Sequence, residues 1–127
     1  MAAEWRPEGS VIGVGKTKFG STTKTIVQLI HEAIGDALRD ADIGPRDLRA
    51  VVVASFLGGP NNSQLHLNSV VAGLMPGLTL PSWRVEAACA SGGVAIHQAL
   101  LSLDVYDPNL VVGVEHMSGV PGLVPTC

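Results

Sequence analysis

The sequence has little of the chemistry that marks several common protein classes. It contains only two cysteines, Cys89 and Cys127, which are too few for a disulfide framework or a cysteine-rich zinc site. Charged residues make up 15% of the chain and the formal net charge is −3, so the basic surface typical of nucleic-acid binding is missing. These scarcities favour a reducing, cytoplasmic setting and give no indication of a metal or a nucleic-acid partner.

The chain also lacks an apolar run long enough to cross a bilayer, because glycine and proline interrupt its hydrophobic stretches. Its first nine residues have no basic start leading into an apolar run, so we expect no secretory signal. The remaining composition, 46% hydrophobic over 127 residues, is typical of one soluble domain with a real core. So thinly charged a surface predicts that another chain, or further sequence, covers part of it.

Hydrophobic periodicity predicts strands and helices in alternation. Apolar or alternating runs predict strands over residues 10–15, 50–54, 83–87 and 110–114. Apolar positions at helical spacing predict helices from about residue 23 to 41, from 63 to about 74, and from about 91 to 103. This order predicts an α/β fold, a mostly parallel sheet with helices on both faces, connected by right-handed crossovers.

Most polar residues near these elements have simple interpretations. Ser21, Thr22 or Thr23 is expected to cap the first helix, and Ser63 the second. We expect solvated positions on the first helix for His31, Asp36, Arg39 and Asp40. The stretch Gly15-Lys16-Thr17 is not a phosphate loop, because Ser10 occupies the position of the required first glycine.

The junction between the strand at 83–87 and the following helix carries the most chemistry. Cys89 falls at or just before the first helical turn, and Ser91, Gly92 and Gly93 follow it. Unpaired backbone N–H groups and the helix dipole favour a thiolate there, in an arrangement similar to a nucleophile elbow. Spacing alone nevertheless slightly favours a buried, inert cysteine.

Three segments resemble the thiolases, most closely the sterol-carrier-protein type with acetyl-CoA acetyltransferase-like members. Residues 86–93, Glu-Ala-Ala-Cys-Ala-Ser-Gly-Gly, resemble the active-site cysteine segment of that family. Residues 111–118, Val-Val-Gly-Val-Glu-His-Met-Ser, resemble its strand ending in Gly-x-Glu-x-Met-Ser, and residues 11–20 its opening strand and turn. The resemblance implies a thiolase-like N-terminal half over residues 10–118. Residues 1–9 are then an extension, and 119–127 a tail truncated before the C-terminal half.

The resemblance also implies acyl transfer on coenzyme A thioesters, with Cys89 as the catalytic nucleophile and no permanently bound cofactor. In thiolases a histidine activates this cysteine, and a second histidine and a second cysteine complete the site. No segment here matches those groups, and neither Cys127 nor His116 takes their place. The residues that bind coenzyme A remain unidentified, and the chain is expected to be incomplete or one part of a split enzyme.

Two other functions stay open, a non-catalytic thiolase-like module that dimerises or binds acyl-CoA, and a ketosynthase-like condensing enzyme. We expect a homodimer, or a partner chain that supplies the C-terminal half. In the family the strand before the cysteine pairs with its twofold copy, so Arg84 and Glu86 are candidates for that interface, with a solvent-facing edge strand as the alternative. Asn62 and His66 lie near the chemistry or on an ordinary surface loop, and packing is the default interpretation of His97.

Overall fold

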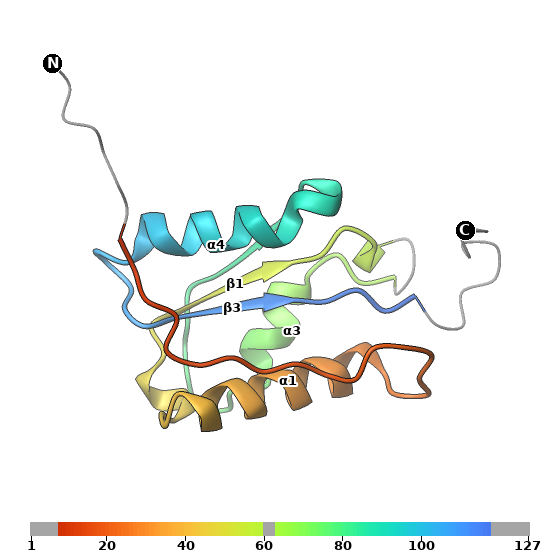
Figure 1. The fold of residues 1–127 in the computed structure, drawn as a ribbon, viewed down its shortest axis with the longest axis horizontal. Helices are drawn as coiled ribbons and strands as arrows, with labels where there is room; N and C mark the ends of the chain where they lie inside the picture. The colour runs from red at the N-terminus through yellow and green to blue at the C-terminus, as the bar shows by residue number, and fades with distance from the viewer. Residues whose placement is uncertain (1–7, 60–62, 118–127) are drawn as a thin grey trace, which may run out of the picture.

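The computed structural model describes residues 8–59 and 63–117 (Figure 1). Its described helices are α1 (Ile26–Asp40), α3 (Leu67–Gly73) and α4 (Ser91–Ser102), with the short 3₁₀ helices η1 (Pro45–Asp47) and η2 (Ala88–Ala90). Its described strands are β1 (Ala50–Ala54), β2 (Ser82–Val85) and β3 (Asn109–Gly113). The alternation of strands and helices predicted from the sequence is therefore confirmed from residue 26 onward.

The three described strands form a parallel sheet in the order β2-β1-β3. In the register of the sheet, Val52 of β1 lies between Trp83 of β2 and Val111 of β3. The chain moves from β1 to β2 on one side and then returns past β1 to β3. The two crossovers therefore run in opposite directions, which places their helices on opposite faces. Figure 1 shows α4 on one face and α1 with α3 on the other, as predicted.

The core has two layers because successive residues of a strand point to opposite faces of the sheet. Val51 and Val53 of β1 pack in the larger layer, toward α1 and α3. The helical residues buried in that layer are Ile30, Ile34, Leu67 and Val71. On the other face, Val52 and Ala54 pack against Ala95 and Ala99 of α4. The second layer is thin because the side chains of α4 that meet the sheet are so small.

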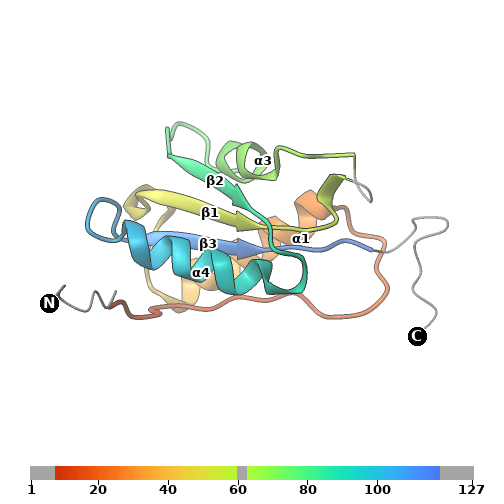
Figure 2. The same cartoon turned by 90° about the horizontal axis from the view of Figure 1, so that it is seen from above.

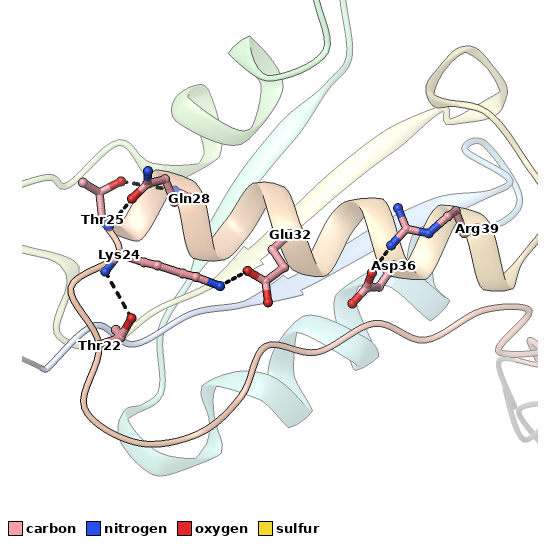
Figure 3. Close-up of polar contacts among 7 residues, drawn as sticks. All are labelled: Thr22, Lys24, Thr25, Gln28, Glu32, Asp36 and Arg39. Atoms are coloured by element: carbon pink, nitrogen blue, oxygen red, sulfur yellow. Dashed lines mark hydrogen bonds and ion pairs between the residues drawn. The ribbon is translucent and has the colours of Figure 1, made fainter.

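Helix α1 begins at a capping box formed by Thr25 and Gln28 (Figure 3). The Thr25 hydroxyl accepts a hydrogen bond from the Gln28 backbone N–H at 3.2 Å, and Gln28 Oε1 accepts one from the Thr25 N–H at 2.8 Å. The predicted caps Ser21, Thr22 and Thr23 are therefore wrong. Thr25 is preferred because it has a glutamine three residues later, so two backbone N–H groups are satisfied reciprocally.

The outward face of α1 is solvated, as the sequence indicates. His31 is exposed, and ion pairs join Asp36 to Arg39 and Glu32 to Lys24 across this face (Figure 3). Exposed pairs of this kind contribute less than about 1 kcal/mol each to stability. Asp40 has an additional role, because its Oδ2 accepts a hydrogen bond from the Val14 backbone N–H at 2.8 Å.

The strand predicted over residues 10–15 is not formed. This segment runs in an extended conformation along α1 (Figure 1), and its approach to the helix is so close that a Cβ on Gly15 would lie 2.1 Å from the Ala33 carbonyl oxygen. Val11, Ile12 and Val14 are 81%, 56% and 68% exposed. The apolar pattern suits a strand, but a strand needs the backbone of a neighbouring strand, and here the neighbour is a helix.

Helix α3 begins at Leu67 with His66 as its N-cap, three residues after the predicted cap Ser63. Ser63 has a φ of 51°, which is incompatible with the first turn of a right-handed helix. The Gln64 side-chain oxygen accepts a hydrogen bond from the His66 N–H at 2.8 Å, a local contact that competes with helix formation. Leu65, which lies before the helix, is 63% exposed. The helix ends at Gly73, within one residue of the predicted end at about residue 74.

Candidate functional site

The carboxyl ends of the three parallel strands meet at one edge of the sheet (Figure 2). The segments that leave this edge begin at Ser55 after β1, at Glu86 after β2 and at Val114 after β3. The chain leaves β1 toward α3 and leaves β2 toward α4, on the opposite face. Adjacent parallel strands whose connections diverge in this way leave a crevice between them, where open α/β sheets bind ligands.

Cys89 lies at this edge, in η2, two residues before the start of α4. Its thiol is free and the residue is exposed. The position predicted from the sequence, at the head of a helix that follows a strand, is confirmed. The prediction from spacing alone, a buried and packed cysteine, is wrong, because Cys89 lies on the solvent-exposed side of the turn.

The turn that carries Cys89 is held by two side chains. The Ser91 hydroxyl accepts a hydrogen bond from the Ala87 N–H at 2.9 Å and donates one to the Ala88 carbonyl at 2.7 Å. The Glu86 carboxylate accepts a hydrogen bond from the Ala88 N–H at 3.1 Å. Ala88 has a φ of 48°, in the left-handed region that alanine rarely adopts. The backbone conformation directly before the thiol is therefore strained and fixed by side chains.

The segment after β1 is anchored from both neighbouring strands. Arg84 of β2 donates from Nη2 to the Ser55 carbonyl at 2.7 Å. The Glu115 carboxylate, which follows β3, accepts hydrogen bonds from the N–H groups of Phe56 and, at 3.0 Å, Leu57. Three successive residues at the carboxyl edge of the sheet are thus held by charged side chains.

Two of these residues were also predicted as candidates for an intersubunit contact, which stays a prediction. Arg84 and Glu86, considered candidates for an intersubunit contact, both make hydrogen bonds within their own chain. A partly buried charged side chain on a strand needs a nearby hydrogen-bond acceptor, and this requirement is the signal by which Arg84 could be found. Glu115 stands out in the sequence only as part of a motif, because its hydrogen-bond partners lie 58 and 59 positions away.

The histidines are spread over the molecule. His31 lies on the exposed face of α1, His66 precedes α3, and His97 is exposed on α4, so none of them directly follows a strand. His116 follows β3 at the same edge as Cys89 and is partly buried. Asn62 and Cys127 lie outside the described residues.

A groove of about 340 Å³ opens beside this edge, between the segment at 15–20, α1 and the residues that follow β3. Lys16, Phe19, Ile30 and Met117 are among its lining residues, and Cys89 is not. Within residues 8–59 and 63–117, no group of three or more His, Cys, Asp or Glu side chains is arranged to hold a metal ion. In the same part of the chain no helix is long and apolar enough to cross a membrane.

Two relatives named acetyl-CoA acetyltransferase are similar to most of the chain. The one from Methanothermobacter thermautotrophicus is 38% identical over 91% of this chain and 31% of its own length, and the one from Methanocaldococcus jannaschii is 40% identical over 87% and 29%. A benzoylsuccinyl-CoA thiolase subunit of Thauera aromatica is 32% identical over 84% of this chain and 27% of its own length. The chain thus spans about 30% of the length of these relatives.

Among solved structures, the crystal structure of a 3-oxoacyl-[acyl-carrier-protein] synthase III from Aquifex aeolicus matches with a TM-score of 0.60. The match covers 74% of this chain and 30% of that one at 21% sequence identity, which identifies a shared fold. The family profile described as "Thiolase, N-terminal domain" matches residues 10–126. The family that the residues around Cys89 and Glu115 resemble is therefore confirmed, and the chain belongs to the thiolase family through its N-terminal domain.

Proposed function

We propose that this chain carries the nucleophile of a thiolase-type acyltransferase, and that Cys89 attacks the thioester carbonyl of an acyl-CoA. The observation that supports this most directly is the exposed, free thiol of Cys89 at the carboxyl edge of a parallel sheet. Membership of the thiolase family supplies the chemical class. The names of the relatives, two acetyl-CoA acetyltransferases and a CoA thiolase subunit, agree on a coenzyme A thioester as substrate.

In the proposed step the Cys89 sulfur, as thiolate, forms a bond to the carbonyl carbon, and the bond from that carbon to the coenzyme A sulfur breaks. Free coenzyme A leaves after its sulfur takes up a proton, and the acyl group stays on Cys89 as a thioester. A second acyl-CoA, deprotonated at its α carbon, or coenzyme A itself then takes the acyl group from the enzyme. The carbon–carbon reaction needs a base for the α proton and donors for the oxyanion.

We propose that those remaining groups come from outside residues 1–127. The relatives are about three times as long as this chain, which leaves ample sequence for a second half. In this proposal residues 10–118 form the nucleophile-bearing domain, 1–9 an extension and 119–127 a tail that precedes a C-terminal half on the same or a partner chain. A second copy or partner chain also accounts for the exposed apolar residues of α4, Val94, Ile96 and Leu101.

Intact-mass measurement after incubation with acetyl-CoA tests the nucleophile. We expect a stable acetyl adduct on the chain, retained in Cys127→Ser and absent in Cys89→Ala. Because Cys89 is exposed and is not part of either core layer, Cys89→Ala should leave the melting temperature nearly unchanged. If no adduct forms, even after a C-terminal half from an acetyl-CoA acetyltransferase relative is added, the chain is instead a non-catalytic module that binds or dimerises.

A condensing enzyme that uses acyl-carrier protein is a second candidate, favoured by the fold shared with the synthase III structure. The same assay distinguishes the two, since acetyl-CoA and an acetylated acyl-carrier protein can be offered in competition. Faster labelling of Cys89 by the carrier-protein thioester would identify the condensing enzyme, and faster labelling by acetyl-CoA the thiolase.

A further inference from the structure

We propose that Ser91 is a positioning residue for Cys89, and that its hydroxyl holds the preceding turn in the conformation that presents the thiol at the head of α4. The proposal rests on the proposed function, in which Cys89 is the nucleophile. It adds a residue that does not itself touch the substrate and acts through the backbone of Ala87 and Ala88.

The surroundings of Ser91 differ from those of its neighbours. Ser91 is 5% exposed, whereas Ala90 before it and Gly92 after it are both exposed. A serine at the start of a helix usually caps it by accepting from an N–H one turn further on. Here the N-cap residue is Ala90, which makes no side-chain hydrogen bond, and the Ser91 hydroxyl is directed back onto the turn. Its function is therefore in the turn and not in the helix.

The turn needs such support because of Ala88. A non-glycine residue with positive φ persists only where its surroundings determine its conformation. The Ala88 carbonyl accepts hydrogen bonds from both the hydroxyl and the backbone N–H of Ser91, and its own N–H is bound by Glu86. Cys89 is the next residue, so the φ angle of Ala88 sets the direction in which the chain, and with it the thiol, leaves β2.

The test uses the full chain with Cys127→Ser, which leaves Cys89 as its one thiol. The measured quantity is the second-order rate of alkylation by iodoacetamide at neutral pH, with the adduct located by peptide mass spectrometry. Ser91→Ala is expected to slow alkylation by about fivefold or more, since loss of the hydroxyl frees Ala88 to relax and move the thiol. Thermal unfolding of each variant is measured in parallel.

Ser102→Ala is the matched control. Ser102 lies on the same helix, and its hydroxyl also donates to a carbonyl three residues earlier, that of Ala99 at 3.0 Å, while accepting from Asn109 at 3.1 Å. It lies at the opposite end of α4 from Cys89. We expect Ser102→Ala and Ser91→Ala to lower the melting temperature by similar amounts, on the order of 4 °C. Unlike Ser91→Ala, Ser102→Ala should leave the alkylation rate of Cys89 unchanged.

A second variant separates positioning from general stability. Glycine adopts positive φ freely, so in an Ala88→Gly background the turn no longer needs the hydroxyl to the same extent. We expect Ser91→Ala to slow alkylation by less than about twofold in that background. If Ser91→Ala alone unfolds the chain at the assay temperature, both serine substitutions are compared in the Ala88→Gly background. Cys89 must then still be alkylated more slowly in Ser91→Ala than in Ser102→Ala.

Two results would overturn the positioning role, an alkylation rate in Ser91→Ala no lower than in Ser102→Ala, and a loss that Ala88→Gly leaves unreduced. The readout needs no acyl transfer, so it is independent of the proposed function. If acetyl-CoA fails to label any variant while the alkylation pattern holds, the proposed function fails and Ser91 still positions the thiol.

Discussion

Glycine and small side chains in this protein act where backbone approaches backbone. At Gly15 the extended segment touches α1 so closely that a Cβ would also lie 2.5 Å from the Ala37 backbone nitrogen. At Gly73, near the end of α3, a Cβ would meet nothing within 4 Å. The two glycines are therefore required to very different degrees, although the sequence around each offers no way to tell them apart.

Replacing Gly15 by alanine should lower the free energy of unfolding by about 1–3 kcal/mol, because backbone atoms of a helix cannot move aside for the new methyl group. Gly73→Ala is the control and should raise it by about 0.5–1 kcal/mol, since alanine is the better helix former. Urea unfolding of both variants measures the difference. Equal effects of the two substitutions would mean that the 10–15 segment does not pack on α1.

Among the elements, α1 and α4 differ in what holds them in place. Helix α1 inserts Ile30 and Ile34 into the larger core layer and starts at a full capping box. Helix α4 meets the sheet through Ala95 and Ala99, and its N-terminal residue Ser91 is committed to the cysteine turn. Helix α1 is thus held both by its core packing and by its own cap, whereas α4 contributes only small side chains to the core and depends more on the contacts at its two ends.

The capping box at the start of α1 contributes to the stability of the fold. Thr25→Ala should lower the free energy of unfolding by about 1 kcal/mol, because the N–H of Gln28 loses its acceptor. Thr23→Ala, an exposed threonine two residues earlier, should change it by less than about 0.5 kcal/mol. Chemical denaturation with far-ultraviolet circular dichroism makes the comparison, and a larger effect at Thr23 would show that the helix starts earlier.

For the whole molecule, the carboxyl edge of the sheet is where distant parts of the chain are joined. Glu115 binds the N–H groups of Phe56 and Leu57, which are 59 and 58 positions away in the sequence. Arg84 binds Ser55 from the other side, 29 positions away. The loop after β1 is therefore held in a defined place at the carboxyl edge of the sheet, where the Cys89 turn also lies.

Glu115→Gln should lower the free energy of unfolding by about 1–2 kcal/mol, because an amide oxygen replaces a charged carboxylate that accepts from two backbone N–H groups. Hydrogen exchange at Phe56 and Leu57 should accelerate. Glu32→Gln removes the same charge from an exposed ion pair with Lys24 and should cost less than about 0.5 kcal/mol. Unchanged exchange at Phe56 and Leu57 in Glu115→Gln would contradict the anchoring role.

Local pattern was sufficient for the main elements and for the position of Cys89. The apolar run of β1, the helical stripe of α1 and the strand-to-helix junction at residues 86–93 each depend on neighbours in the sequence, and each is found where predicted. Helix α3 starts later than predicted because Gln64 binds the His66 backbone locally. The cap of α1 lies two to four residues after the predicted ones because Gln28 completes a capping box with Thr25.

The sequence by itself determined which segments are strands and helices from residue 26 onward, the family, and the place of Cys89 at a strand-to-helix junction, because periodicity and motif are local properties. Only the tertiary structure decided that residues 10–15 lie along a helix, that Arg84 and Glu115 hold the loop after β1, and that Ser91 is buried beneath the cysteine turn. The physical reason is that a backbone group forms a hydrogen bond with whichever partner the fold brings within reach. Which partner that is depends on segments far apart in the chain.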